Sequence, residues 1–241
     1  MDALLRDLRF GVRMLLKRPV LSLAAIVTFG LGIGLTTAVF SILNGLFLKG
    51  LPYEGSERVM AIRVANPSLG YSRMGVGVHD FVELREQQTV YEGLGAYDDA
   101  EVNFAAADGP PERLAGGYFG SGILRQLGIR PTLGRGFRDE EERPGAEPTV
   151  IIGHDLWQNR FGGSRDVLGQ TVRINGATRT IVGVMPAGFA FPHHQQVWLP
   201  LRIDPAASER GRGPSYDVIG RLKDGVSLEQ AQAQLATLVA R

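Results

Sequence analysis

The chain has 241 residues, with 26 lysines and arginines against 25 aspartates and glutamates, and no cysteine. This near-neutral balance excludes a simple basic nucleic-acid binder, and a hydrophobic fraction of 44% excludes an acidic disordered tail. The lack of cysteine excludes disulfide frameworks, cysteine-ligated zinc and thiol nucleophiles. These averages resemble those of an ordinary soluble protein, but the charges are unevenly distributed along the chain.

Residues 1–18 are basic and have a helical pattern, with five basic residues, two acidic residues and a net charge of +3. Four cations recur at steps of three, four and four residues, which places them on one helical face. This pattern predicts a cytoplasmic amphipathic helix that lies on the membrane, with its cations near anionic lipid headgroups. The alternative is that the charges only set the topology. The predicted basic face consists of Arg6, Arg9, Arg13, Lys17 and Arg18.

Residues 19–48 contain no charged residue, and a run of this length is the signature of a transmembrane helix. Thirty helical residues would extend about 45 Å, which exceeds the hydrocarbon thickness of roughly 30 Å, so a tilt or a short stalk is expected. Pro19 fits the break between the surface helix and the span. A buried core helix and a cleaved signal peptide are the alternatives. The length of the run and the lack of an A-x-A cleavage pattern favour an uncleaved anchor.

The charges on either side of the span predict its orientation. The basic cluster precedes the span, whereas the first 17 or so residues after it carry only three cations, Lys49, Arg58 and Arg63. By the positive-inside rule, the N-terminus is cytoplasmic and residues 49–241, with a net charge of −2, are extracytoplasmic. We expect a single-pass protein of the bacterial inner membrane.

Small residues recur inside the span at four-residue spacing, at Gly30, Gly34 and Ala38. Such a stripe lets a second membrane helix approach closely, because apolar burial does not drive association within lipid. The same stretch is not a nucleotide loop, since it lacks the third glycine of G-x-G-x-x-G and a preceding strand. We therefore predict a helix-packing face at these three residues.

Residues 49–241 read as an extracytoplasmic α+β domain, because short strands and helices interleave without a regular βαβ rhythm. The Asn175-Gly176 pair between two β-rich runs predicts a hairpin, and Ser227 to Gln230 form a capping box that opens the last helix. The short acidic run Asp139–Glu142 is expected to be solvated. Further strands are expected at Arg58–Val64, Gly95–Phe104, Arg113–Tyr118 and Thr149–Gly153, and helices at Val78–Gln88, Ile123–Leu127 and from Leu156 through Phe161.

The residue types needed for catalysis do not form a recognisable constellation. The four histidines lack the H-E-x-x-H context of a zinc protease, and His193 and His194 are adjacent on a probable loop. Asp98 and Asp99 are neighbours on a strand, so they face opposite sides. We expect no catalytic residue, no cofactor and no metal, and therefore no enzyme. An anchored hydrolase would require a pocket that joins His193 or His194 to two carboxylates.

Several stretches together resemble one family, the MacB-like, FtsX-type permeases of ABC transporters, and within it the bacterial group of duplicated "orphan" permeases. The first of them resembles the family's first membrane helix, and the others resemble its extracytoplasmic core domain in the family's order. The stretches are Thr28–Tyr53, Phe81–Tyr97, Ile129–Pro144, Leu156–Gly163, Arg179–Pro192 and Gly220–Gln230.

The resemblance implies a permease-type membrane subunit of the mechanotransmission type, related to export or efflux, without an ATPase of its own. Implied partners are membrane lipids, other permease helices or a second permease half, a separate cytoplasmic ABC ATPase and a periplasmic partner protein, with no nucleic acid. The chain ends before the family's further membrane helices, so we expect an N-terminal part of a permease. The alternative is a membrane-anchored extracytoplasmic binding or sensing domain without transport activity.

Overall fold

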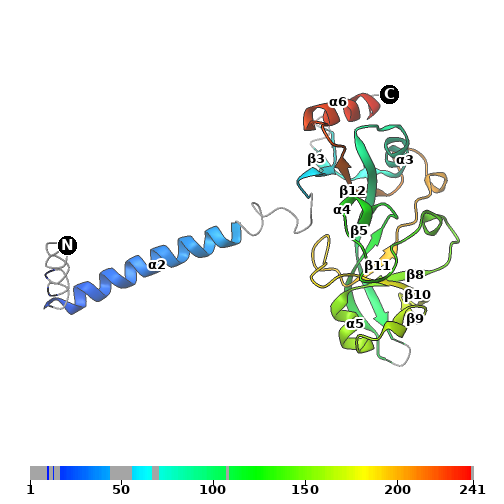
Figure 1. The fold of residues 1–241 in the computed structure, drawn as a ribbon. Helices are drawn as coiled ribbons and strands as arrows, with labels where there is room; N and C mark the ends of the chain where they lie inside the picture. The colour runs from blue at the N-terminus through cyan, green and yellow to red at the C-terminus, as the bar shows by residue number, and fades with distance from the viewer. Residues whose placement is uncertain are drawn as a thin grey trace. The chain divides into compact units, whose positions relative to one another are not determined.

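The computed structural model of the chain describes residues 10, 13, 17–43, 56–66, 71–106 and 109–239. The chain divides into two compact units, Met1–Pro52 and Tyr53–Arg241, which we call the N-terminal and the C-terminal unit (Figure 1).

The N-terminal unit contains the long helix α2 (Pro19–Leu43), which begins at the proline expected to start it. Within α2, Ser22–Ser41 has a mean hydropathy of 2.0 and none of its residues is buried. Among the described residues it is the one helix long and apolar enough to cross a membrane. Two of its hydroxyls donate hydrogen bonds to carbonyls one turn earlier, Thr28 to Ala24 at 2.8 Å and Thr36 to Gly32 at 2.7 Å. The last residues of the expected span, 44–48, lie outside the described residues.

The described residues of the C-terminal unit form many short strands, four helices and four 3₁₀ turns. Its helices are α3 (Val78–Gln87), α4 (Ile123–Leu127), α5 (His154–Phe161) and α6 (Leu228–Val239), and its 3₁₀ turns are η2 (Ser56–Arg58), η4 (Asp139–Glu142), η5 (Arg165–Val167) and η6 (Pro205–Ala207). The described strands are β1 (Val59–Ile62), β2 (Val64–Asn66), β3 (Tyr71–Met74), β4 (Val76–Gly77), β5 (Tyr91–Ala105), β6 (Glu112–Phe119), β7 (Leu133–Gly134), β8 (Thr149–Ile152), β9 (Thr171–Ile174), β10 (Ala177–Val184), β11 (Val197–Pro200) and β12 (Ser215–Leu222).

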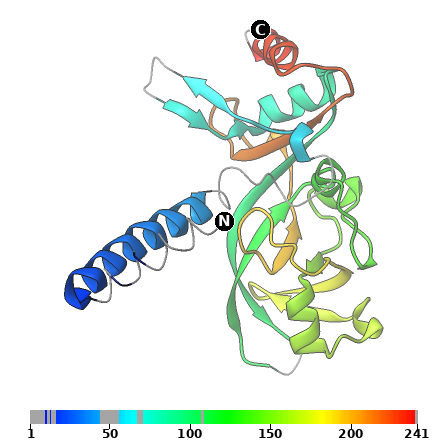
Figure 2. The same cartoon turned by 60° about the vertical axis from the view of Figure 1, so that its left-hand side comes forward.

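The long strand β5 connects two halves of this unit, and Figure 2 shows it running between them. The first part of β5 pairs with β12, which in turn pairs with the edge strand β1. The last part pairs with β6 and β9, and the path β5-β6-β11-β8-β10-β9 returns to β5. These six strands therefore form a closed ring, which contains both parallel and antiparallel pairs. The predicted α+β class is confirmed.

Three hydrophobic clusters fill the C-terminal unit. The ring encloses the first, with Val102 of β5 and Ile152 of β8 fully buried. The second lies among β12, β5, α3 and α6, where Phe81 and Ala231 are buried. The third surrounds Trp198, whose indole donates a hydrogen bond to the Phe191 carbonyl at 3.0 Å. The half that contains α3 and α6 and the half formed by the ring of strands thus each have a hydrophobic core of their own.

Several local predictions are confirmed. Helix α3 forms within the range expected for a helix, and it buries Phe81 and Leu84. Asn175 and Gly176, with φ of 51° and 82°, form the turn between β9 and β10. The capping box forms, since Ser227 and Gln230 exchange backbone-to-side-chain hydrogen bonds of 2.9 and 3.3 Å. The single strand expected at Arg58–Val64 is instead two, because β1 pairs with β12 whereas β2 pairs with β3.

Candidate functional site

Among the described residues of the N-terminal unit, nothing covers the stripe of small residues on α2. Gly30, Gly34 and Ala38 are all exposed. A Cβ atom built on either glycine would meet no described atom within 4 Å, so no described part of the chain explains why side chains are lacking there. The packing role of this stripe therefore stays a prediction about a second helix.

The basic face lies only partly within the described residues. Arg13 and Lys17 have helical backbone and are exposed, and Arg18 lies, also exposed, at the bend before Pro19. Arg6 and Arg9 lie outside the described residues. The contact of these side chains with a membrane surface remains a prediction.

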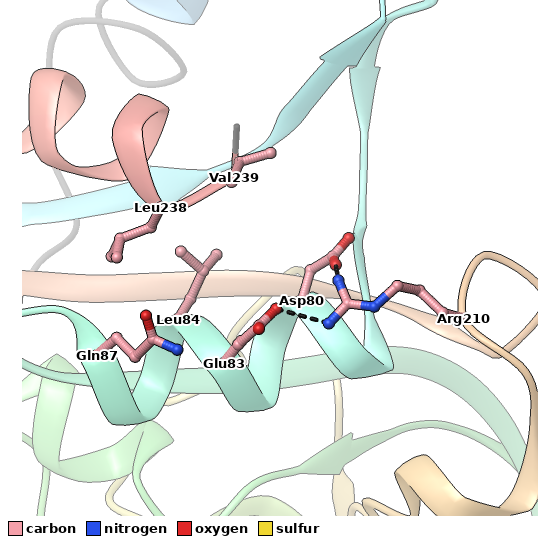
Figure 3. A pocket seen from close by; sticks show the side chains of 7 residues that line it. All are labelled: Asp80, Glu83, Leu84, Gln87, Arg210, Leu238 and Val239. Atoms are coloured by element: carbon pink, nitrogen blue, oxygen red, sulfur yellow. Dashed lines mark hydrogen bonds and ion pairs between the residues drawn. The ribbon is translucent and has the colours of Figure 1, made fainter. Parts of the chain in front are cut away.

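A groove of about 450 Å³ separates α3 from the end of α6 (Figure 3). Arg210 closes one side of the groove, since its guanidinium donates to Asp80 at 2.8 Å and to Glu83 at 2.7 Å. The hydrogen bond and charge of Glu83, with the charge of Asp80, raise the pKa of Arg210, which therefore remains a cation. The remaining lining is mainly apolar and consists of Leu84, Gln87, Leu238 and Val239.

The acidic run Asp139–Glu142 is solvated only in its first half, because Asp139 and Glu140 are exposed whereas Glu141 and Glu142 are buried. Glu142 accepts hydrogen bonds from Arg85 of α3 at 2.8 Å and from the Ser121 backbone at 2.7 Å. Glu141 accepts from both terminal nitrogens of Arg135, at 2.8 and 3.0 Å. The two carboxylates link η4 to α3 and to the turn before α4, so the run has a structural role. The sequence signal was the spacing of Arg135 and Arg138 ahead of the carboxylates.

The ionisation of Glu141 reflects this environment. Burial disfavours the carboxylate, but the hydrogen bonds from Arg135 and from the Arg138 backbone, together with the charge of Arg135, outweigh burial. The net effect lowers the pKa of Glu141 below its ordinary value of 4.5. Glu141 is therefore a charged structural group at neutral pH rather than a proton donor.

The histidines do not assemble a catalytic or metal site in the described part of the chain. No group of three or more histidines, aspartates or glutamates there could hold a metal ion. His193 lies 3.4 Å from Asp99, whose other oxygen accepts a hydrogen bond from Gln195 at 3.1 Å. His194 and His154 line a pocket of about 250 Å³ in which Asp155 is the one carboxylate among the described lining residues. The pair of carboxylates that a hydrolase would need beside a histidine is not found there.

Asp98 and Asp99 lie on β5, as neighbours on a strand. Burial, followed by the charges of Asp99 and Asp217, raises the pKa of Asp98. Asp99 instead contacts the loop that precedes β11 through His193 and Gln195. The two carboxylates thus have different surroundings, as expected of neighbours that face opposite sides of a strand.

The chain has an apolar helix followed by a mixed α+β unit, and these two features place it in the class of domains that carry a membrane-type helix. The particular family follows from the sequence, since residues 22–238 match the MacB-like periplasmic core domain and the chain therefore belongs to that family. The match begins within α2 and ends within α6. This is a domain of ABC transporter permeases and generally not of enzymes, and such permeases work with an ATPase and with other permease parts.

Solved structures have the same fold. The chain is 14% identical to the periplasmic region of MacB from Actinobacillus actinomycetemcomitans, with a TM-score of 0.58 over 76% of this chain and 82% of that one. It is 20% identical to a domain of a permease protein from Porphyromonas gingivalis, with a TM-score of 0.60 over 78% and 86%. It is 15% identical to the extracellular domain of the noncanonic ABC-type transporter YknZ from Gram-positive bacteria, with a TM-score of 0.50 over 73% and 87%. A comparison with curated proteins found no match.

Proposed function

We propose that the chain is a permease-type membrane subunit of an ABC exporter, in which α2 anchors the C-terminal unit outside the cytoplasm. The observation that supports this most strongly is the single family match over residues 22–238, which includes the apolar helix as well as the folded unit. The net charge of +3 before the span favours a cytoplasmic N-terminus. In this arrangement the bacterial inner membrane surrounds α2.

The proposed mechanism is mechanical. A cytoplasmic ABC ATPase drives small movements of the membrane helices, and these move the C-terminal unit against substrates or a partner protein outside the membrane. In this mechanism the ATPase supplies the chemical step, and the described residues of the chain serve as anchor and moving domain. The stripe at Gly30, Gly34 and Ala38 would contact another permease helix or a second permease half, because small residues allow close helix approach. The basic face from Arg6 to Arg18 would contact anionic lipid headgroups.

The groove between α3 and α6 favours a second candidate function, a membrane-anchored binding or sensing domain. Its volume of about 450 Å³ lies within the range of small-molecule sites, and its lining combines an apolar floor with the charges of Asp80, Glu83 and Arg210. Such a domain would work without an ATPase and without further membrane helices. The two functions therefore differ in the partners that they require.

Crosslinking in native membranes distinguishes the two functions. The full chain, carrying an affinity tag, is crosslinked, solubilised in detergent and purified, and ATP hydrolysis and bound proteins are then measured. We expect an ABC ATPase to be recovered, and less of it from the variant Gly34→Leu than from the control Gly32→Leu, whose substitution lies on the opposite helix face. A chain that purifies alone, without ATP hydrolysis, would contradict the transporter function and favour the binding domain.

A further inference from the structure

The side chain of Arg58, the last residue of η2, contacts the turn that precedes α6. Its Nη1 atom donates to Asp224 Oδ1 at 2.6 Å, to the Leu222 carbonyl at 3.1 Å and to Glu92 Oε1 at 3.2 Å. Because this nitrogen carries two hydrogens, at least one of them is shared between two acceptors. Arg58 and Asp224 are 166 positions apart in the sequence, so the contact joins two segments from near the two ends of the unit's sequence.

Strand register places Arg58 at this position. In the antiparallel β1–β12 pair, Val59 is opposite Arg221, so the preceding residue, Arg58, is opposite Leu222. The side chain reaches past the end of the ladder to the turn that separates β12 from α6. Backbone hydrogen bonds hold this turn, from Lys223 to the Val90 carbonyl at 3.0 Å and from Val226 to the Lys223 carbonyl at 3.2 Å. Arg58 therefore connects the start of β1 to the turn between β12 and α6, beyond the backbone pairing of β1 with β12.

Helix α6 is attached firmly near its start and more loosely near its end. Ala231 is fully buried, and Gln234 both accepts from the Thr89 backbone at 2.8 Å and donates to the Thr89 hydroxyl at 2.7 Å. Farther along, Leu238 and Val239 line the groove above α3, and Val239 is half exposed (Figure 3). The turn contains Gly225 at φ of 78°, a backbone conformation that other residues rarely adopt. Helix α6 is thus held by the turn before it and by contacts along its first half, and its exposed end at Val239 follows the orientation that these set.

We propose that Arg58 is a positioning residue that couples η2, where the described part of the C-terminal unit begins, to α6, its last helix. A displacement of residues 56–58 is passed through the Arg58–Asp224 contact to the turn at Gly225 and changes the orientation of α6. The use of this coupling in transport rests on the proposed function. The coupling itself does not, because it is a property of the folded unit.

The exposure of the contact indicates a local rather than a global role. The Asp224 side chain is 94% exposed and the Arg58 side chain 33%, and exposed ion pairs contribute little to overall stability. Loss of the contact should therefore loosen α6 without unfolding the sheet. A purely structural role would instead affect the whole unit equally.

Amide hydrogen exchange of the full chain in detergent tests the proposal with Arg58→Met, which keeps the apolar stem and removes the guanidinium. We expect exchange in residues 228–239 to increase about two- to fivefold, the factor typical of an exposed ion pair, while β8 exchanges as in the wild type. The matched control is Arg113→Met, which removes another exposed ion pair, with Glu101 of β5, and should leave α6 unchanged.

A second variant keeps the proposal testable if Arg58→Met unfolds. Asp224→Asn retains Arg58 and its contacts with Glu92 and Leu222, and it should increase α6 exchange on its own. In the double variant, Asp224→Asn should increase α6 exchange no further than Arg58→Met alone, because Arg58→Met already removes the partner of Asp224. Wild-type exchange of α6 in both variants, or an equal increase in Arg113→Met, would overturn the coupling. Neither result depends on whether an ATPase is recovered, so failure of the coupling and failure of the proposed function are distinguishable.

Discussion

Helix α2 and the C-terminal unit use their apolar residues in opposite ways. In α2 they face outward, with Phe29 70% and Leu35 71% exposed, whereas in the C-terminal unit side chains such as Trp198 are almost fully buried. An exposed apolar surface of this size is not stable in water and indicates a membrane or a partner. The C-terminal unit encloses its own cores, while α2 exposes its apolar side chains among the described residues of its own unit.

The largest expected effect comes from the core around Trp198, which packs on Phe119 and Phe189 at ring distances of 5.9 and 5.2 Å. Trp198→Ala should lower the free energy of unfolding of the C-terminal unit by about 3–5 kcal/mol, because it leaves a cavity and an unpaired Phe191 carbonyl. Thermal unfolding followed by near-ultraviolet circular dichroism measures this change. The control Phe29→Ala, on α2, should leave the unfolding of the C-terminal unit unchanged. If Phe29→Ala and Trp198→Ala lower its unfolding free energy equally, α2 and the C-terminal unit are not separate in stability.

A smaller effect is expected at the buried carboxylate of Glu142. Glu142→Gln keeps the shape but removes the charge that accepts from Arg85 and Ser121, which should cost about 1–3 kcal/mol. The expected loss of unfolding free energy is modest because the Arg85 side chain is 35% exposed, so water can hydrate its guanidinium in the variant. Urea unfolding of this variant and of the exposed control Glu140→Gln gives the difference. A Glu142→Gln variant as stable as the control would show that the acidic run is not a structural link.

The stability of the C-terminal unit should also depend on Glu141 at acidic pH. Because the folded unit lowers the pKa of Glu141, the carboxylate stabilises the folded state fully above its ordinary value of 4.5. This contribution is lost as the pH falls below 4.5 and through the lower folded value. Unfolding of the wild type and of Glu141→Gln, measured from pH 7 to pH 3, should therefore converge at the acidic end. A difference that stays constant over this range would contradict the assignment.

The smallest effect on folding is expected in α2. Gly34→Leu should change the unfolding free energy of the C-terminal unit by less than about 0.5 kcal/mol, because a side chain at Gly34 meets no described atom. The same substitution should weaken association with another membrane helix, which chemical crosslinking in native membranes would detect. If Gly34→Leu destabilises the C-terminal unit as Trp198→Ala does, the two regions are not independent in the way described.

Local sequence signals predicted the local structure well. Helix α3, the Asn175-Gly176 turn and the Ser227–Gln230 capping box depend on neighbouring residues, and each forms as expected. The strands β11 and β12 were not predicted. Strand β11 is a four-residue run that is buried throughout and ends in proline, so it lacks the alternation that identifies a strand.

The parts of the site that depend on distant residues could not be predicted. The buried position of Glu142 depends on Arg85, which comes from a helix 57 positions away in the sequence. The contact of Arg58 with Asp224 requires the pairing of β1 with β12, and β12 itself was missed. For α2, by contrast, composition alone predicted the helix, because thirty uncharged residues need no tertiary partner to define them.

Single-cysteine labelling in intact cells tests the central claim most directly, because the chain has no cysteine of its own. Cysteine replaces Thr178, an exposed residue of β10, in one variant and Asp2 in another. The account predicts that a membrane-impermeant maleimide labels Thr178→Cys in intact spheroplasts, and Asp2→Cys only after lysis. Protection of Thr178→Cys, labelling of Asp2→Cys without lysis, or loss of residue 2 from the mature chain would contradict an anchored subunit with its folded unit outside the cytoplasm.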